Sequence, residues 1–451
     1  MEYRYRDASE MKDSGVEWIG KIPKNAKITK LKYNSNFING YEFKSEDLKL
    51  ESKVPVIRIS DIRENGIEES KMLKVDEDLT RNLEMYRIKN NDILIAMSGA
   101  TVGKIMYITK NNEALINQRV GIIRPLDINS KYLYYSVNNT KFRNEILLSS
   151  TGGAQENISS ENIKNKYIIQ FSNKEQENIV KFLDKKTSQF DSIISKKETL
   201  IEKLEEAKKS LISEVVTGKV KVVKTDDGYD LVKRSSDEVK DSGVEWLGEI
   251  PKDWENIKIK RLSRIGRGAS PRPIDDPVYF DENGEYAWTR IADVSKSNKY
   301  LTETKQKMSE RGSLLSVKLE INKLFLSIAG SVGKPCITGI KACIHDGFVY
   351  FPDLQEYLND YLYYIFYGGQ CYKGLGKLGT QLNLNRETVG DIRIGIPKDK
   401  EEVNYITSFL EQYLYQIDKL ITSIELQIEK LKEAKQSLIS EAVTGKIEIL
   451  D

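Results

Sequence analysis

The chain repeats itself at an offset of about 228 residues, and this duplication limits the folds that the sequence can adopt. DSGVEWIG at residues 13–20 returns as DSGVEWLG at 241–248, and KLEEAKKSLISEVVTGKV at 203–220 returns as KLKEAKQSLISEAVTGKI at 430–447. A period of this length is one whole domain with a connecting helix, far above the roughly 20 to 50 residues of solenoid and propeller repeats. The sequence therefore predicts two equivalent units in tandem.

The repeat divides the chain into five segments. We predict one globular domain at residues 1–174 and a second at 241–398. Each is followed by a long spacer helix, at 175–218 and 399–447, and residues 219–240 form a linker between the copies. The length of 451 residues alone suggests about three domains, but the duplication favours two units.

Short apolar runs inside each domain predict strands, because they are rich in Ile and Val and bounded by Asn, Asp and Gly. These runs are VIRISDI at 56–62, NDILIAMSGATVGK at 91–104, WTRIADV at 288–294 and NKLFLSIAGSVGK at 322–334. The Tyr-rich segments at 131–139 and 360–369 have helical spacing instead. Each domain is therefore predicted to be mixed α/β (α+β), and Trp18 and Trp246 in the repeated openings are predicted to anchor it.

The spacer helices carry a heptad seam of apolar residues. In the second helix the seven-residue intervals fall at Leu410, Ile417, Ile424, Leu431 and Leu438, with Leu414, Ile421, Ile428 and Ala434 between them. The first helix repeats the seam at Leu183, Phe190, Leu204 and Leu211. Lys197 stands where the second helix has Ile424, and one polar residue in a seam can set the register.

A heptad seam needs a partner, and each spacer helix has one in the same chain. We predict that the two helices, each on the order of 60 Å long, run antiparallel as an intramolecular coiled coil with a pseudo-two-fold repeat. Gly218 and Gly445 end them, since glycine readily takes the left-handed conformation of a helix terminus. The alternative is that both helices dimerise with another subunit.

The charge and the apolar content leave several functions open. Lys and Arg total 70 against 68 Asp and Glu, so the net charge of +2 neither supports nor excludes DNA binding. No apolar run approaches the roughly 18 to 20 residues of a membrane-spanning helix. Cys336, Cys343 and Cys371 have no partners in the first copy, so we expect reduced thiols in a cytoplasmic protein.

Catalytic motifs are incomplete in this sequence. GATVGK at 99–104 has three residues between its glycines where a phosphate-binding loop has four, and Ile105 stands in place of Ser or Thr. His345 is the only histidine, so no histidine cluster can hold a metal. The string at 276–279, DPVY, lacks the second proline of an adenine methyltransferase tetrad. We therefore expect no enzyme activity and no metal in this chain.

The chain resembles the DNA-specificity subunit of a type I restriction-modification system. The resemblance rests on two motifs that each occur twice, the opening DSGVEW(I/L)G(K/E)IPK and the helix end EAK(K/Q)SLISE(V/A)VTGK, joined to two variable domains of about 150 residues. The resemblance covers essentially the full length. It implies a non-catalytic protein in which each variable domain, a target-recognition domain, reads one half of a bipartite DNA target.

The resemblance also implies partners. The helices would set the gap between the half-sites and dock two modification subunits, which carry S-adenosylmethionine and methylate adenine at N6. Restriction subunits that use ATP and Mg²⁺ would join that complex. No cofactor is expected in this chain.

Candidate DNA contacts follow from comparing the two halves, because different half-sites need different base readers, whereas shared residues suit phosphates or folding. In the first half they are Arg58, Lys104, Asn117, Gln118, Arg119, Gln155 and Asn157. In the second half they are Arg290, Lys334, His345, Asp346, Gln381, Asn383, Asn385 and Arg386.

Each candidate also has a structural interpretation. Lys104 and Lys334 either bind phosphate or support the fold. Arg58 and Arg290 lie close to an Asp in the sequence, which is typical of an ion pair that orients a loop. Asp346 either accepts a hydrogen bond from cytosine or caps a turn.

Two other functions compete with DNA recognition. A coiled-coil scaffold would bind partner subunits without sequence preference, and an autonomous modifying enzyme would be active as the purified chain alone. A split methylation motif that depends on this chain would favour the specificity subunit over both.

Overall fold

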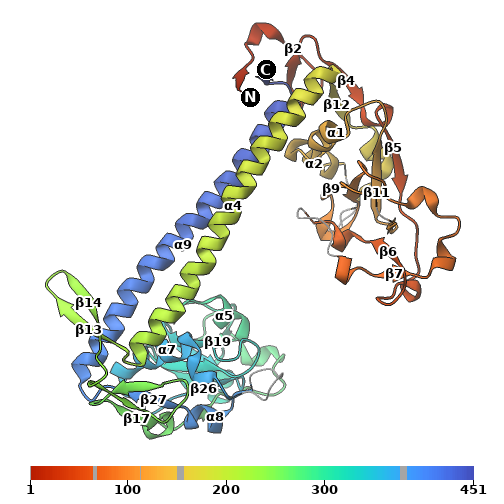
Figure 1. Ribbon diagram of the computed structural model, residues 1–451. Coiled ribbons are helices and arrows are strands. Elements are labelled where there is room, and N and C mark those ends of the chain that lie inside the picture. Colours follow the sequence, from red (N-terminus) through yellow and green to blue (C-terminus); the bar gives the residue numbers. More distant parts are fainter. Residues whose placement is uncertain (1, 64–68, 112, 150–156, 376–382, 451) are drawn as a thin grey trace. The chain divides into compact units, whose positions relative to one another are not determined.

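The computed structural model describes residues 2–63, 69–111, 113–149, 157–375 and 383–450 (Figure 1). The chain divides into two compact units. Unit 1 comprises Met1–Lys197 with Glu425–Asp451, and unit 2 comprises Glu198–Ile424. Each unit therefore combines one variable domain with a part of both long helices, and the predicted mixed α/β fold is confirmed in both.

Unit 1 contains a four-stranded antiparallel sheet, in the order β5-β11-β8-β9, and a three-stranded sheet, in the order β10-β6-β7. The strands are β5 (Ser35–Asn39), β6 (Val54–Ile57), β7 (Lys74–Val75), β8 (Ile93–Ala96), β9 (Ile105–Tyr107), β10 (Leu115–Ile116) and β11 (Val120–Pro125). β8 is buried along its whole length, as a continuous apolar run predicts. The helices are α1 (Ser130–Val137), α2 (Thr140–Leu147) and α3 (Ser160–Lys164).

Unit 2 repeats this plan with larger sheets, in the orders β18-β26-β23-β24-β20 and β21-β19-β25-β22. The strands are β18 (Gly266–Arg267), β19 (Tyr286–Thr289), β20 (Tyr300–Leu301), β21 (Lys307–Met308), β22 (Val317–Leu319), β23 (Leu324–Ser327), β24 (Pro335–Thr338), β25 (Ala342–Ile344) and β26 (Phe348–Tyr350). The helices are α5 (Ile291–Lys296), α6 (Glu310–Leu314), α7 (Asn359–Gly368) and α8 (Arg386–Asp391). The predicted Tyr-rich helices are thus α1 and α7.

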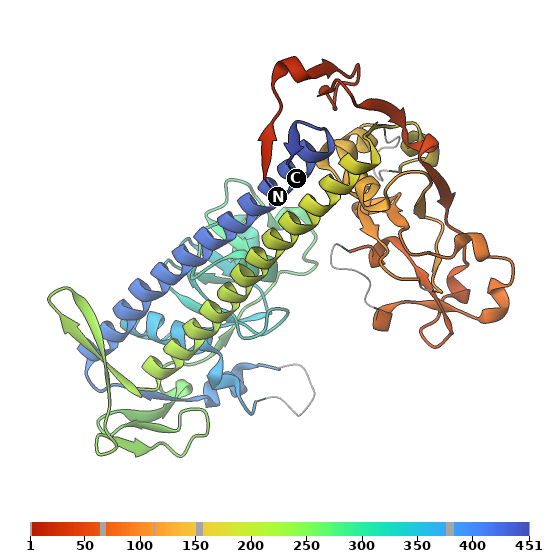
Figure 2. The same ribbon diagram turned by 45° about the horizontal axis from the view of Figure 1, so that its top comes forward.

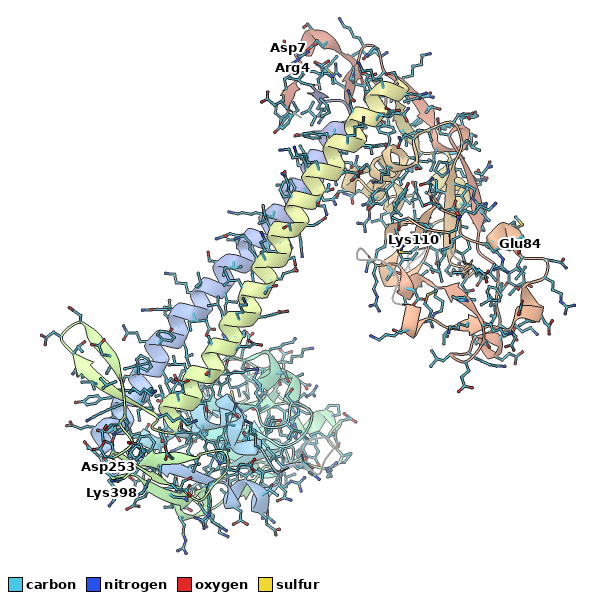
Figure 3. All side chains as sticks on the ribbon, in the orientation of Figure 1. Arg4, Asp7, Glu84, Lys110, Asp253 and Lys398 are labelled. Carbon is cyan, nitrogen blue, oxygen red and sulfur yellow. The ribbon has the colours of Figure 1, made fainter. Side chains whose placement is uncertain are left out.

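Paired short strands close each variable domain next to the long helices. β4 (Lys27–Lys30) pairs with β12 (Tyr167–Gln170), and β17 (Glu255–Lys258) pairs with β27 (Arg393–Ile396), both antiparallel. Asp253 and Lys398, labelled in Figure 3, flank the second pair in the chain, before β17 and after β27. The repeated openings form β2 (Met11–Asp13) with β3 (Lys21–Pro23), and β15 (Val239–Asp241) with β16 (Glu249–Pro251).

The long helices α4 (Asn173–Val216) and α9 (Lys400–Val443) pack against each other within both units (Figure 1, Figure 2). In unit 1 the Lys197 ammonium donates to Gln427 Oε1 at 2.6 Å. In unit 2 the buried Lys208 ammonium pairs with Asp418. As α4 advances from Lys197 to Lys208, the contacts on α9 move back from Gln427 to Asp418. The helices are therefore antiparallel, and the predicted intramolecular coiled coil is confirmed.

The predicted seam residues are buried or half-buried, with one exception. Leu183, Leu410, Leu414, Ile417, Ile421, Ile424 and Ile428 are buried, and Phe190, Leu204, Leu211, Leu431 and Leu438 are half-buried. Ala434 is exposed, so its assignment to the seam was wrong. Lys435 follows Ile428 at the heptad interval instead, and its ammonium pairs with Asp191 Oδ1 at 2.6 Å.

Each long helix ends where it meets a repeated opening. Gly218 and Gly445 have φ of +72° and +70°, as predicted for the glycines that end these helices. A Cβ on Gly218 would lie 2.5 Å from Pro251, and one on Gly445 would lie 2.5 Å from Pro23. The two repeated motifs are therefore in contact within each unit, and glycine is needed there for its backbone and for its size.

The segment 219–240, which the sequence assigns to a linker, contains a hairpin of β13 (Val220–Thr225) and β14 (Gly228–Lys233). Unit 1 has a corresponding pair in which β1 (Tyr3–Tyr5) runs antiparallel to β28 (Ile447–Ile449). Arg4, labelled in Figure 3, reaches Glu10 and Glu448 from this pair. No helix in the described ranges is long and apolar enough to cross a bilayer.

One other expectation differs from the structure. The strands predicted over 56–62 and 288–294 stop at Ile57 and Thr289, and short helices follow. The cause is an Asp three residues after each strand-ending Arg, described below. Trp18 and Trp246 pack against the cores but stay half-buried, whereas Trp254 is fully buried.

Candidate nucleic-acid interface

Four loops of each unit lie against one another, and together we name them the four-loop cluster. In unit 1 they are residues 39–43, 57–61, 97–104 and 116–119, and in unit 2 they are 267–272, 289–293, 328–334 and 344–347. The same backbone hydrogen bonds hold both clusters. Met97 N donates to Arg119 O at 2.9 Å, as Ile328 N donates to Gly347 O at 2.8 Å. The two clusters therefore share one backbone frame.

Glycine occupies the point in each cluster where the first and last loops touch. A Cβ on Gly40 would lie 2.0 Å from the carbonyl oxygen of Asn117, and one on Gly268 would lie 2.0 Å from that of His345. No side chain fits there, so both units keep glycine. Asn117 and His345 thus hold equivalent places, as the sequence alignment of the halves predicts.

The second loop is shaped by an aspartate that accepts a backbone hydrogen bond. Asp61 Oδ2 accepts from Arg58 N, and Asp293 Oδ2 accepts from Arg290 N, both at 2.9 Å. This bond stabilises the first turn of a short helix, because the carboxylate satisfies a backbone donor at its start. It explains why the strands end just before these arginines, at Ile57 and Thr289.

The two arginine side chains differ although their backbones match. The guanidinium of Arg58 pairs with Asp61, with Nε 3.2 Å from Oδ2. Arg290 is exposed, and its Nη2 donates to Gln306. The ion-pair interpretation from the sequence therefore describes Arg58, whereas Arg290 and Gln306 line an open cleft of about 670 Å³.

The third loop carries the two shared lysines. Lys334 Nζ donates to the carbonyl oxygens of Ser295 and Ser297 at 2.8 Å each. It thus supplies hydrogen bonds to carbonyl groups at the C-terminal end of α5. Burial lowers the pKa of Lys334. Lys104 is exposed, and among the described residues nothing accepts a hydrogen bond from its ammonium. Of the two alternatives, Lys334 has the geometry of a structural residue, and Lys104 is open to a phosphate.

The fourth loop presents the residues that differ most between the halves. Asn117 is half-buried and its Oδ1 accepts from Gln118 N at 2.8 Å, while Gln118 and Arg119 are exposed. In unit 2, His345 Nδ1 accepts instead from the backbone two residues on, Gly347 N, at 2.8 Å.

Two ionisable groups in this turn are shifted by their surroundings. Burial lowers the pKa of His345, and nearby Arg290 lowers it further, against the opposing charge of Asp346. Burial tends to raise the pKa of Asp346, but the hydrogen bond from Ser270 and the neighbouring His345 and Arg272 hold it below the usual value. At neutral pH the turn therefore combines a neutral imidazole with a carboxylate.

The remaining candidates lie beside the clusters or outside the described residues. Asn157 forms a β-bridge with Ser98 of the third loop in unit 1. Asn385 caps α8, since its Oδ1 accepts from Glu387 N and Thr388 N at 2.9 Å. Asn383 and Arg386 are exposed next to it. Gln155 and Gln381 lie outside the described residues.

Sequence reasoning missed the first loop of each cluster. It brings Asn39 into the cluster of unit 1, and Arg267, Ser270 and Arg272 into that of unit 2. These segments share little sequence apart from Gly40 and Gly268. That shared glycine, followed by unlike residues, was the one signal that could have found them.

The described residues offer no metal centre. No group of three His, Cys, Asp or Glu side chains among them is placed to hold an ion. Cys336, Cys343 and Cys371 are buried free thiols. Burial raises the pKa of Cys336 to about 12 and that of Cys343 to about 11, so these thiols are protonated at neutral pH.

Comparison with known proteins gives a family and a fold. The family described as "Type I restriction modification DNA specificity domain" matches residues 23–206 and again 251–430. The two matched regions correspond to the two copies of the internal repeat and together span most of the chain.

Solved structures with similar chains include one described in work on complex assembly and conformational transition of the type I R-M system. It has a TM-score of 0.68 and 14% identity, over 94% of this chain and 99% of that one. An HsdS subunit from Thermoanaerobacter tengcongensis has a TM-score of 0.46 and 13% identity, over 94% of this chain and 98% of that one. The first similarity shows a shared fold.

Proposed function

Because this chain belongs to the type I restriction-modification DNA specificity family, we propose that each unit reads one half of a bipartite DNA target and that α4 and α9 set the gap between the halves. Specificity subunits of this family are non-catalytic. Methylation, ATP-driven translocation and cleavage then belong to partner subunits in the cytoplasm.

One observation carries the two-reader proposal. The four-loop clusters have the same backbone hydrogen bonds and the same glycine contacts, yet they present different side chains. A shared frame with unlike side chains is what two readers of unlike half-sites need, because base edges are distinguished by the donors and acceptors that meet them.

The long helices offer surfaces for partner subunits. Apolar side chains are exposed on them away from the seam: Ile193 and Leu426 in unit 1, and Leu200, Tyr413, Tyr415 and Leu420 in unit 2. Exposed apolar groups that gather on one element favour a protein contact. We assign these helices to two modification subunits that bind S-adenosylmethionine and methylate adenine at N6, with restriction subunits that use ATP and Mg²⁺ joining that complex.

The proposal is tested by long-read methylation sequencing of DNA from cells that express this chain with its modification subunit, against cells that lack this chain. We expect a split methylation motif with a fixed gap only when the chain is present. Methylation that is identical without the chain would instead favour the scaffold function.

A further inference from the structure

The four-loop cluster of unit 2 holds two arginines around one carboxylate. Arg267 Nε donates to the backbone oxygen of Asp346 at 2.7 Å, and its Nη2 lies 4.0 Å from Asp346 Oδ2. Arg272 Nη2 lies 3.5 Å from the same Oδ2. Ser270 Oγ donates to Oδ1 at 2.9 Å, so both carboxylate oxygens are engaged.

These contacts contribute little to folding. The side chains of Arg267 and Arg272 are 54% and 74% exposed, and that of Asp346 is 43% exposed. Ion pairs this open to water are screened by solvent and add little to stability. The arrangement nevertheless fixes the direction of two guanidinium groups, which is useful when a ligand must meet them in one orientation.

Unit 1 builds the same frame without arginines at these places. The register of the strands puts Asn39 opposite Gly121 where unit 2 has Arg267 opposite Val349. Gln118 takes the place of Asp346, and Lys44, four residues after the shared glycine, takes the place of Arg272. The guanidinium pair is therefore specific to one unit, as a reader of one half-site must be.

We propose that Arg267 and Arg272 read guanines in the half-site of unit 2, and that Asp346 is the positioning residue that orients both. This inference rests on the proposed function of the chain. A guanidinium fork matches the O6 and N7 acceptors of guanine in the major groove. Asp346 engages one edge of each guanidinium, and among the described residues no other side chain binds either guanidinium group.

Arg264 provides a matched control. It lies three residues before Arg267 and is 80% exposed, but its Nε and Nη2 both donate to Asp353, at 2.7 and 2.9 Å. Its fork is thus occupied by a carboxylate. Arg264→Gln removes the same charge as Arg267→Gln or Arg272→Gln without removing a proposed reader.

The test measures methylation of a plasmid library in which each half-site is randomised, in cells that express each variant with its modification subunit. We expect Arg267→Gln and Arg272→Gln each to lower the preference for guanine at one position by about 5- to 150-fold. All other positions should keep their preference, and Arg264→Gln should match the unchanged chain. Gln118→Ala, in unit 1, should weaken the base preference in the other half-site. The half-site that this variant leaves unchanged is then the one that unit 2 reads.

Asp346→Asn separates positioning from folding. It should weaken the preference at the Arg272 position, with the melting temperature unchanged. The Arg267 position should lose less, because Arg267 Nε keeps its hydrogen bond to the backbone oxygen of residue 346. At the Arg272 position, the double variant Arg272→Gln with Asp346→Asn should lose no more guanine preference than Arg272→Gln alone. The effects of the two substitutions are not additive when one residue acts through the other.

Unchanged guanine preference in both arginine variants would overturn the inference while leaving the proposed function intact. A half-site of unit 2 without guanine on either strand would overturn it as well. Absence of any motif with the unchanged chain would instead reject the proposed function, so the two failures are distinguishable.

Discussion

At the scale of single residues, identical sequence letters have different surroundings in the two units. Lys104 and Lys334 both follow Val-Gly, but only Lys334 meets carbonyl acceptors, which lie 39 and 37 residues away in the chain. Arg58 binds the Asp that shapes its loop, and Arg290 binds Gln306 instead. Side-chain function in these clusters therefore depends on residues that the local motif does not contain.

His345 gives a titration that reports on the cluster of unit 2. Because burial lowers its pKa, we expect a midpoint below the ordinary value of about 6.5. As the only histidine, it gives one NMR imidazole signal. Asp346→Asn should lower the midpoint further, since Asp346 favours the charged imidazole, and Arg290→Gln should raise it. A midpoint at or above 6.5 in the unchanged chain would contradict the described burial.

The same shift predicts how stability depends on pH. Below about pH 6.5 the unfolded chain binds a proton that the folded imidazole binds more weakly. The contribution of His345 to stability is therefore fully present above that pH and is lost as the pH falls. Replacing His345 by Gln should remove this part of the pH dependence in urea unfolding.

These residues show which parts of the site could be predicted from the sequence. The pairing of Asn117 with His345 and the ion-pair interpretation of Arg58 came from aligned motifs, and the structure places those residues as expected. Arg267 and Arg272 were missed because their loop aligns only through one glycine. Their grouping depends on strand register between β18 and β26, which short motifs do not encode.

At the scale of elements, the helices were the most predictable part, because a seven-residue period over many turns has few alternative explanations. The strands over 56–62 and 288–294 were predicted too long, because a β-rich composition does not reveal that Asp61 and Asp293 bind backbone donors and start helices. Apolar patterns thus identified the elements, while polar capping decided where they end.

The glycines at the helix ends give a test of their contact with the openings. Gly218→Ala or Gly445→Ala should cost roughly 2 to 5 kcal/mol, since left-handed strain adds to overpacking against proline. Gly15 has φ +71°, but a Cβ there would meet nothing within 4 Å, so Gly15→Ala should cost only about 1 to 2 kcal/mol. Urea unfolding measures both, and equal losses would argue against the contact.

The heptad seam predicts that α4 and α9 tolerate the insertion of whole heptads. Seven residues inserted after Lys197 and after Ile424 keep the apolar period and lengthen the helix pair by about 10 Å. The gap between half-sites should then grow by about 3 base pairs, with both half-sites unchanged in methylation sequencing. An insertion in only one helix breaks the seam and serves as the destabilised control. An unchanged gap after the paired insertion would reject the role of the helices in spacing.

At the scale of the whole molecule, each unit takes a variable domain from one copy of the repeat and a helix end from the other. The variable domains join this repeated part at equivalent hydrogen bonds, Leu31 N to Lys166 O at 2.9 Å and Ile259 N to Ile392 O at 3.0 Å. Everything between these points belongs to one domain, and everything outside belongs to the shared scaffold. If recognition resides in the domains, they should be exchangeable at these points.

The most direct test of two separate readers is therefore a chain in which residues 31–166 replace residues 259–392. Long-read methylation sequencing should then find the half-site of unit 1 at both ends of the target, and the half-site of unit 2 should be lost. A motif that keeps the original half-site of unit 2 would contradict the assignment of one half-site to each unit.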